Sequence, residues 1–308
     1  MHWRWLRHAL SPILLLLACG GISLALSKQH FDACTFASCN NSQLLPASNL
    51  AVEKLQKLGE EITVKVLSKE FIGSGTLIKR QGQIYTVITN AHVLRADNPP
   101  YQIQTADGSI YEATAPSLVN KDNDLALLKF DSKNAYSVAA LGDSSNLSVG
   151  EKVFVGGFAS NSRKFIFTSG QVTLILDKAL KGGYQIGYTN NIRKGMSGAP
   201  LLNHRGEVIG INGLHKDPVW DAPDLYQDGS QPCKPLQDLI TRSSMAVPIQ
   251  TVMQSTASEV NLKNLRSTQP KPAILNSQVN TYISSFEAPM QAQAEAAKNC
   301  IFSQGKLK

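Results

Sequence analysis

Short apolar runs recur along the chain from residue 62 onward. Each has five to seven residues and is closed by Gly, Asn, Asp or Lys before the next begins. Runs of this length and spacing are typical of strands in a barrel or sandwich, and no long helical pattern alternates with them. The pattern therefore predicts an all-β fold. The runs are ITVKVLS (62–68), GTLIKR (75–80), IYTVITN (84–90), YQIQT (101–105), LALLKF (125–130), KVFVGGF (152–158), QVTLIL (171–176), YQIGYT (184–189), APLLN (199–203), EVIGING (207–213) and MAVPIQ (245–250).

The two flanks of this region have a different pattern. Residues 48–61, SNLAVEKLQKLGEE, predict a short helix with Val52, Leu55 and Leu58 along one side. Residues 214–243 are rich in Pro and Asp and predict a long loop, and loops of that length are usually functional or tied down. Residues 284–300, SSFEAPMQAQAEAAKNC, predict a helix near the C-terminus.

The N-terminus has the layout of an export signal. Arg4 and Arg7 precede an uncharged, largely apolar stretch that reaches Leu26. We favour cleavage after a small-x-small site ending at Ser27. Two alternatives remain open: lipidation of Cys19 at the lipobox-like sequence LLAC, and an uncleaved anchor. The predicted organisation is a signal peptide at 1–27, an N-terminal extension at 28–59, one domain at 60–256 and a C-terminal extension with a helix at 257–308.

Composition narrows the function classes. The chain has 308 residues, 43% of them hydrophobic, and a formal net charge of +7. Its lysines and arginines are scattered, with no run longer than two. Without a basic patch or interleaved aromatics, nothing here favours nucleic-acid binding. We expect no cofactor.

Five cysteines are present, and loss or lipidation of Cys19 leaves four. An even number in an exported chain predicts two disulfides, for which three pairings exist. We prefer Cys34 with Cys39, which are close in sequence, and Cys233 with Cys300. Metal binding is the weaker interpretation, because no histidine pair accompanies the cysteines at finger spacing, and no metal is expected.

Candidate chemistry begins at RKGMSGAPLLN (193–203), where Ser197 lies between glycines. Alone, this segment is as easily a turn before a strand. A nucleophilic serine needs a histidine and a carboxylate. His92 lies in VITNAHVLRAD, at the end of an apolar run, and Asp124 lies in NKDNDLALLKF, directly before another. Asp122 is the alternative carboxylate, but Asp124 adjoins the apolar run and should be more buried.

The three segments TNAHVL, NDLALLK and KGMSGAP occur in the order His, Asp, Ser. Together they resemble the catalytic segments of trypsin-like serine proteases, closest to the exported bacterial and Deg/HtrA-type enzymes. GSGTLI (73–78), TSGQV (168–172) and GEVIGIN (206–212) add to the resemblance, which covers about residues 60–256. It implies two six-stranded antiparallel β-barrels with the active site in the cleft between them.

The resemblance also implies roles. Ser197 would attack the peptide carbonyl, His92 would accept its proton, and Asp124 would orient His92. The backbone N–H groups of Gly195 and Ser197 would form the oxyanion hole. Met196 stands where zymogen-activated relatives carry an aspartate, so we expect no activating cut and an apolar, packing role for this side chain.

Substrate recognition is less specified. The position six residues before the serine is Asn191, and a neutral side chain there should not strongly favour Lys or Arg substrates. The strand resembling the substrate-binding one and the residues after it add further candidates: Ile211, Asn212, Gly213 and His215.

The sequence therefore predicts an exported serine endopeptidase, periplasmic or extracellular, acting on polypeptides. Membrane contact is expected only through an N-terminal lipid or anchor. One alternative is a catalytically silent binding or scaffold protein with the protease fold. The other is a Deg-type quality-control protease without a PDZ domain. We expect no PDZ domain because the segment after residue 256 is too short to form one.

Overall fold

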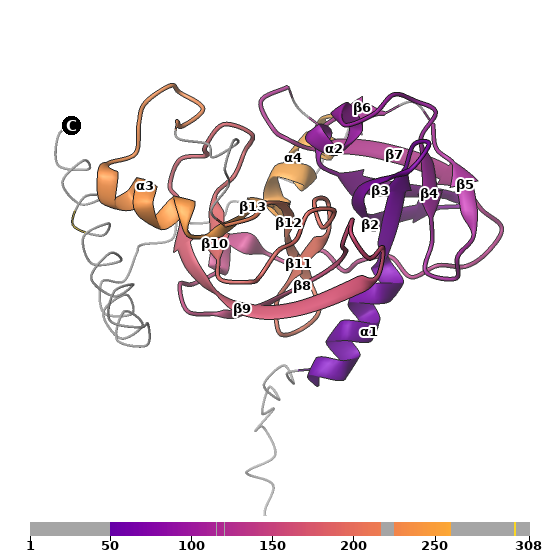
Figure 1. Ribbon diagram of the computed structural model, residues 1–308, viewed down its shortest axis with the longest axis horizontal. Coiled ribbons are helices and arrows are strands. Elements are labelled where there is room, and N and C mark those ends of the chain that lie inside the picture. Colours follow the sequence, from indigo (N-terminus) through magenta and orange to yellow (C-terminus); the bar gives the residue numbers. More distant parts are fainter. Residues whose placement is uncertain (1–49, 115, 120, 217–224, 260–298, 300–308) are drawn as a thin grey trace, which may run out of the picture. The chain divides into compact units, whose positions relative to one another are not determined.

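A computed structural model describes residues 50–114, 116–119, 121–216, 225–259 and 299, all within one compact unit. The described part has an antiparallel β-sheet followed along the chain by a closed antiparallel barrel (Figure 1). The sheet has seven strands in the order β5-β4-β1-β2-β3-β7-β6. They are β1 (Thr63–Leu67), β2 (Phe71–Gln81), β3 (Ile84–Thr89), β4 (Gln102–Gln104), β5 (Ile110–Glu112), β6 (Ser117–Leu118) and β7 (Ala126–Asp131).

The barrel has six strands in the closed order β10-β13-β12-β11-β8-β9. They are β8 (Lys152–Phe158), β9 (Phe165–Ile175), β10 (Ile186–Tyr188), β11 (Pro200–Leu202), β12 (Val208–Leu214) and β13 (Ser244–Pro248).

The all-β, two-part architecture predicted from the sequence is confirmed, and each of the eleven apolar runs overlaps a strand. The first half differs from the expectation, because it is a seven-stranded sheet and not a closed six-stranded barrel. The short strands β5 and β6 do not coincide with any of the eleven apolar runs. They form because β4 and β7 offer them backbone partners at the two edges of the sheet.

The core consists of three hydrophobic clusters, of which one joins the two halves. One fills the first sheet around Tyr85, Leu128 and Phe130, and another fills the barrel around Val155 and Tyr188. The largest cluster contains residues of both halves and of the helices. Apolar area removed from water stabilises such a cluster in proportion to its size. The two halves therefore share a core, and segments at their junction are held in place from both sides.

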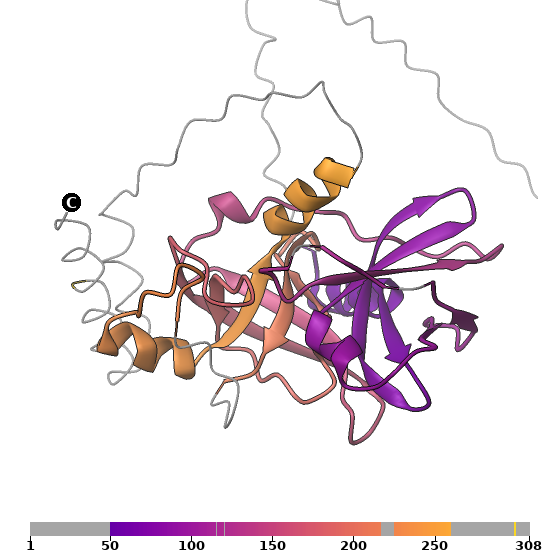
Figure 2. The ribbon, with the colours of Figure 1, turned by 90° about the horizontal axis from the view of Figure 1, so that it is seen from above.

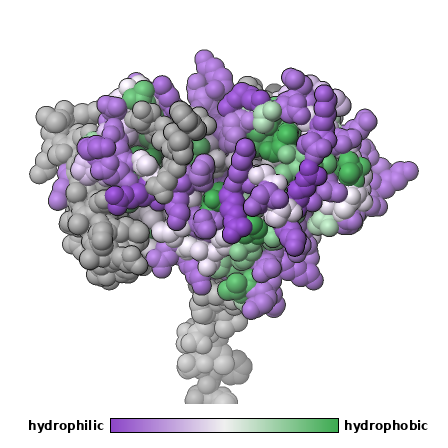
Figure 3. Space-filling view, viewed as in Figure 1, coloured by the Kyte–Doolittle hydropathy of each residue, from purple (hydrophilic) through white to green (hydrophobic). Residues whose placement is uncertain are grey.

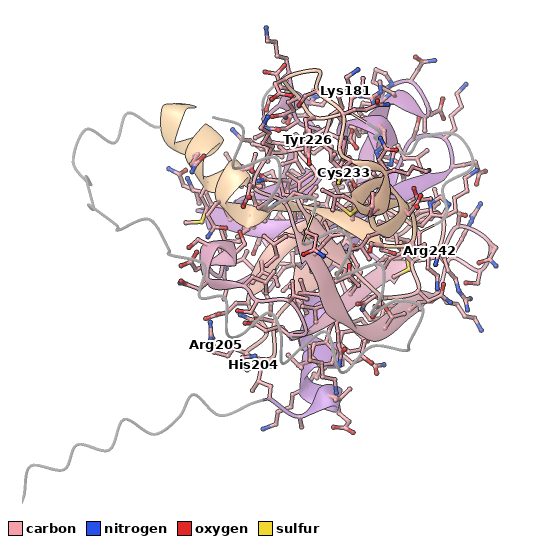
Figure 4. The ribbon with its side chains drawn as sticks, turned by 90° about the vertical axis from the view of Figure 1, so that its left-hand side faces the viewer. Lys181, His204, Arg205, Tyr226, Cys233 and Arg242 are labelled. Atoms are coloured by element: carbon pink, nitrogen blue, oxygen red, sulfur yellow. The ribbon has the colours of Figure 1, made fainter. Side chains whose placement is uncertain are left out.

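Helix α1 (Val52–Ile62) packs on this shared core through Leu55 and Leu58, as predicted, whereas Val52, which was expected on the same side, is exposed. Leu55 and Ile62 are buried, and the backbone N–H of Leu50 donates to the carbonyl of His204. Figure 4 shows the labelled His204 and Arg205 near this helix. The other helices are α2 (Ala91–Arg95), α3 (Lys234–Thr241) and α4 (Ile249–Glu259), and η1 (Ser144–Asn146) is a single 3₁₀ turn.

The expectation of a continuous loop over residues 214–243 is wrong for its last part, which contains α3. Leu236, Leu239 and Ile240 face the core at helical spacing, and a proline lies in the first turn, where the helix needs no N–H donor. Figure 1 and Figure 2 both place α3 at the end of the barrel away from the first sheet.

Cys233 precedes α3 and is disulfide-bonded; Figure 4 labels it at the start of the helix, below Tyr226. The other four cysteines lie outside the described residues, as do the predicted signal peptide and C-terminal helix. The two pairings therefore stay predictions.

The surface visible in Figure 3 is mainly hydrophilic, with small, separate apolar patches. Within residues 50–259, as far as they are described, no helix combines the length and apolar character needed to span a bilayer.

Replacing Leu55 with alanine should destabilise the protein by about 2–5 kcal/mol, because it leaves a cavity under α1 that packed strands cannot fill. Val52, which is 44% exposed on the same helix, provides the control, and Val52→Ala should change the free energy of unfolding by no more than about 0.5 kcal/mol. Urea unfolding measures both. Equal losses in the two variants would contradict the packing of α1 described above.

Candidate active site

His92 and Asp124 form a close pair at the junction of the two halves. His92 lies in the short helix α2, which begins two residues after β3 ends, and Asp124 lies two residues before β7. The His92 Nδ1 atom is 2.5 Å from Asp124 Oδ2, and the His92 backbone N–H donates to Asp124 Oδ1 at 2.8 Å. The His92 side chain is 36% exposed and that of Asp124 only 10%. The pair therefore presents an accessible imidazole held from behind by a nearly buried carboxylate.

The loop that carries Asp124 is fixed through its backbone as well. The Asp124 N–H donates to the carbonyl of Gly182 at 2.8 Å, and Asn90 Nδ2 donates to the Asp124 carbonyl at 2.9 Å. The Tyr184 hydroxyl donates to Asp124 Oδ2 at 2.5 Å, and Arg95 lies 3.6 Å from Oδ1. Donors from both halves thus converge on one carboxylate.

These donors set the charge of Asp124. Burial by itself raises the pKa of the carboxyl, but hydrogen bonds from His92 and Tyr184 and the charge of His92 bring the pKa below its ordinary value. A carboxylate that accepts several hydrogen bonds is stabilised in its ionised form. Asp124 is therefore an anion beside His92 over the whole neutral range.

Ser197 follows a tight turn in which the N–H of Met196 donates to the carbonyl of Arg193. Gly195, inside this turn, has a φ of 95°, a conformation that glycine adopts without steric cost. Ser74 of β2 fixes the segment from the first half. Its hydroxyl donates to the Gly195 carbonyl at 2.8 Å, and its N–H donates to the Ser197 carbonyl at 2.9 Å.

Gly213 of β12 links Ser197 to the His92–Asp124 pair. The Ser197 hydroxyl donates to the Gly213 carbonyl at 3.3 Å. A Cβ on Gly213 would overlap the Tyr184 hydroxyl and come within 2.9 Å of Asn90 Nδ2. Tyr184 and Asn90 both donate to Asp124. The three residues predicted to act together are therefore brought to one place.

The oxyanion-hole candidates lie at the same turn. In the described part of the chain, the N–H groups of Gly195 and Ser197 donate to no carbonyl or side chain. Gly195 leaves no room for a side chain, since a Cβ there would lie 2.6 Å from the Ser160 nitrogen and 2.9 Å from the Phe71 ring.

Met196 is fully buried, which confirms its expected packing role. Its carbonyl accepts a hydrogen bond from Asn212 Nδ2 at 2.8 Å, and Asn212 Oδ1 accepts one from the Tyr188 hydroxyl. Both Asn212 and Tyr188 are fully buried. A neutral hydrogen-bonded chain thus supports the serine turn from inside the barrel.

The other recognition candidates are more dispersed. Asn191 and His215 are exposed, whereas Ile211 and Asn212 are buried. Ile211 packs in the cluster shared by the two halves, and the Asn212 side chain bonds to Tyr188 inside the barrel. The carbonyl of Gly213 accepts the hydrogen bond from Ser197. Ile211 and Asn212 therefore offer no side-chain surface to a ligand, and any contact they make would be through the backbone.

Comparison with known proteins agrees with this geometry. The profile of the trypsin-like peptidase domain family matches residues 73–211. This chain contains a trypsin-like peptidase domain. The family expected from the three segments is thereby confirmed.

Several serine proteases resemble this peptidase domain. HTRA4 of Mus musculus is 36% identical over 152 residues, which are 46% of this chain and 29% of that protein. HTRA1 of Xenopus tropicalis and the Do-like HtrB of Bacillus subtilis (strain 168) are each 34% identical over 152 residues, again 46% of this chain, and 31% and 32% of their own lengths. The chain thus spans about a third or less of the curated relatives it matches.

Sequence reasoning missed four residues that shape the site of the peptidase domain. Ser74 and Thr76 bind the carbonyls of Gly195 and Gly198. The GSGT segment that carries them was noted only as a resemblance. Tyr184 and Arg95 face Asp124, and neither lies in a segment that suggests this role.

Asp124→Asn should destabilise the peptidase domain near neutral pH by about 1–3 kcal/mol, because it removes a hydrogen-bonded buried charge. The folded-state pKa of Asp124 lies below its ordinary value of 3.8. The ionised group therefore stabilises the fold above that pH, and the contribution is lost as the pH falls through the folded value. The deficit of Asp124→Asn should shrink below about pH 3.8.

Urea unfolding across this pH range measures the deficit. Asp131→Asn is the control, since Asp131 is exposed at the end of β7; this variant should match the wild type at every pH. A deficit of Asp124→Asn that is independent of pH would contradict the assignment.

Proposed function

We propose that this chain is a serine endopeptidase that cleaves polypeptides through Ser197, His92 and Asp124. The observation that carries the proposal is the 2.5 Å contact between His92 Nδ1 and the nearly buried Asp124 carboxylate. It occurs within a peptidase domain whose serine hydroxyl bonds to Gly213. Gly213 lies against Tyr184, which donates to that carboxylate, and against Asn90, which donates to the Asp124 backbone carbonyl. The names of the relatives, which are serine proteases, support the same reaction class.

The chemistry follows from these groups. The Ser197 Oγ attacks the peptide carbonyl while His92 Nε2 takes the hydroxyl proton. His92 then gives that proton to the leaving amine, and an acyl-enzyme remains on Ser197. Water repeats the sequence, with His92 again as base, and releases the acid. Asp124 keeps the Nδ1 proton of His92 in place and stabilises the imidazolium.

The proposed oxyanion hole uses the N–H groups of Gly195 and Ser197. The peptide that carries the Gly195 N–H is held through the Lys194 carbonyl, which accepts from the Ser160 N–H at 2.8 Å. The peptide that carries the Ser197 N–H is held through the Met196 carbonyl, which accepts from Asn212 Nδ2 at 2.8 Å. These bonds support a fixed direction for both donors. A pre-oriented donor of this kind typically lowers the barrier by about 3 kcal/mol.

We also propose that no activating cut is needed. Met196 is buried in an apolar cluster and offers no charge for a newly formed N-terminus. The uncharged hydrogen bonds from Tyr188 to Asn212 and from Asn212 to the Met196 carbonyl support the turn before Ser197 from within the barrel. With the neutral Asn191 at the pocket position, the substrate preference should not be strongly basic.

The site of action is proposed to be the periplasm or the cell exterior, after export through the N-terminal segment. The uncharged stretch that follows Arg4 and Arg7 supports export. A disulfide at Cys233 is also typical of an oxidising compartment.

A fluorophosphonate should label Ser197 and no other residue of the folded, mature protein. Ser197→Ala should abolish labelling and lower peptide hydrolysis by at least about 10³-fold, because the nucleophile is lost. Mass spectrometry of the labelled peptides locates the adduct, and a quenched peptide library measures hydrolysis.

Ser132→Ala is the matched control, since this buried serine of the first half lies in a hydroxyl network with Tyr111 and Asn134. It should keep labelling and hydrolysis at wild-type levels. Folded protein that never reacts at Ser197 would instead favour the silent binding protein.

The Cys233–Cys300 pairing is tested by peptide mapping without reductant. The bond would close a loop of about 67 residues and stabilise the fold by about 4 kcal/mol in the chain-entropy model. Cys300→Ser should therefore lower the melting temperature while Ser197 still labels. A peptide joining Cys233 to Cys34 or Cys39 would rule the pairing out.

A further inference from the structure

Tyr184 belongs to the barrel half, and its side chain contacts Asp124 of the first half. It lies in the turn between β9 and β10, it is only 3% exposed, and its hydroxyl donates to Asp124 Oδ2 at 2.5 Å. The same oxygen contacts His92 Nδ1. One carboxylate oxygen therefore accepts both from the imidazole and from the phenol.

The turn that carries Tyr184 is shaped to bring it against Asp124. The Leu180 N–H donates to the Tyr184 carbonyl at 3.0 Å, and Gly182 accepts from the Asp124 N–H at 2.8 Å. Gly182 and Gly183 have φ values of 84° and 85°, which side chains rarely adopt. A Cβ on Gly182 would lie 2.7 Å from the Tyr184 ring. The turn thus binds Asp124 through its backbone and its tyrosine together.

Gly213 provides the space for the phenol. Any side chain at this position would overlap the Tyr184 hydroxyl, while the Gly213 carbonyl accepts from Ser197. The position of Tyr184 against Asp124 and the position of Ser197 therefore both depend on Gly213, which must lack a side chain.

The phenol acts as a neutral donor. Burial, and then the neighbouring charge of Asp124, raise the pKa of Tyr184 well above its ordinary value, so its proton stays in place. The charged and titratable groups around Asp124 are His92 and Arg95 from α2 and Tyr184 from the β9–β10 turn, with Tyr188 of β10 acting on Tyr184.

We propose that Tyr184 is a positioning residue whose hydroxyl holds the Asp124 carboxylate against His92. Its effect on rate rests on the proposed function, whereas its effect on Asp124 does not. A purely structural tyrosine would add stability without changing how Asp124 titrates.

Tyr184→Phe tests the difference by two independent readouts. The first is the ¹³C NMR titration of the Asp124 carboxyl carbon, whose midpoint should move to higher pH, because a donor to the charged form is lost. The second is the rate at which a fluorophosphonate labels Ser197. That rate should fall by about 10-fold or more, the usual scale for a hydrogen bond to a charged group, with the acid limb of its pH profile displaced upward.

Tyr85→Phe is the control, because the Tyr85 hydroxyl is buried in the first sheet and donates to the Asn134 carbonyl. It should cost similar stability and leave both readouts unchanged. If Tyr184→Phe does not fold, 3-fluorotyrosine at position 184, a stronger donor, should move the Asp124 midpoint to lower pH.

An Asp124 midpoint unmoved by either change would overturn the proposal, whatever Ser197 does. A displaced midpoint in a wild-type protein that never labels at Ser197 would uphold the role of Tyr184 and overturn the proposed function instead.

Discussion

The burial of the Asp124 carboxylate is the constraint on which the rest of the site depends. Removing a charge from water costs several kcal/mol unless hydrogen bonds replace the lost hydration. Here the replacements come from the His92 backbone and ring on one side and from Tyr184 on the other. Since those donors belong to different halves of the molecule, the carboxylate is satisfied only when the halves are correctly joined.

The joining itself relies on close backbone approach. Ser74 and Thr76 of β2 donate their hydroxyls to the carbonyls of Gly195 and Gly198. A side chain on Gly198 would overlap the Ser74 carbonyl and the Thr89 hydroxyl. Hydroxyls on one half and glycines on the other are therefore complementary, and together they hold the serine turn without any charged group.

Neutral support continues inside the barrel, where Tyr188, Asn212 and the Met196 carbonyl form one chain of hydrogen bonds. Fully satisfied, a buried polar network rigidifies its surroundings, and a missing member leaves costly unpaired groups. The proposed nucleophile is thus braced by residues fixed during folding. This arrangement suits a protease that is competent as soon as it has folded.

The sequence by itself determined most strands and the three central residues, because both signals are local. Short apolar runs closed by polar or glycine residues specify strands, and His92, Asp124 and Ser197 each lie in a short segment with its own pattern. Tertiary structure alone decided that Tyr184 contacts Asp124, that Asn212 turns inward, and that β5 and β6 extend the first sheet. Helix α3 was missed although its apolar spacing was present, because the surrounding Pro and Asp residues favoured a loop. Tyr184 is 60 positions from the carboxylate to which it donates, and local patterns do not encode which distant donor arrives.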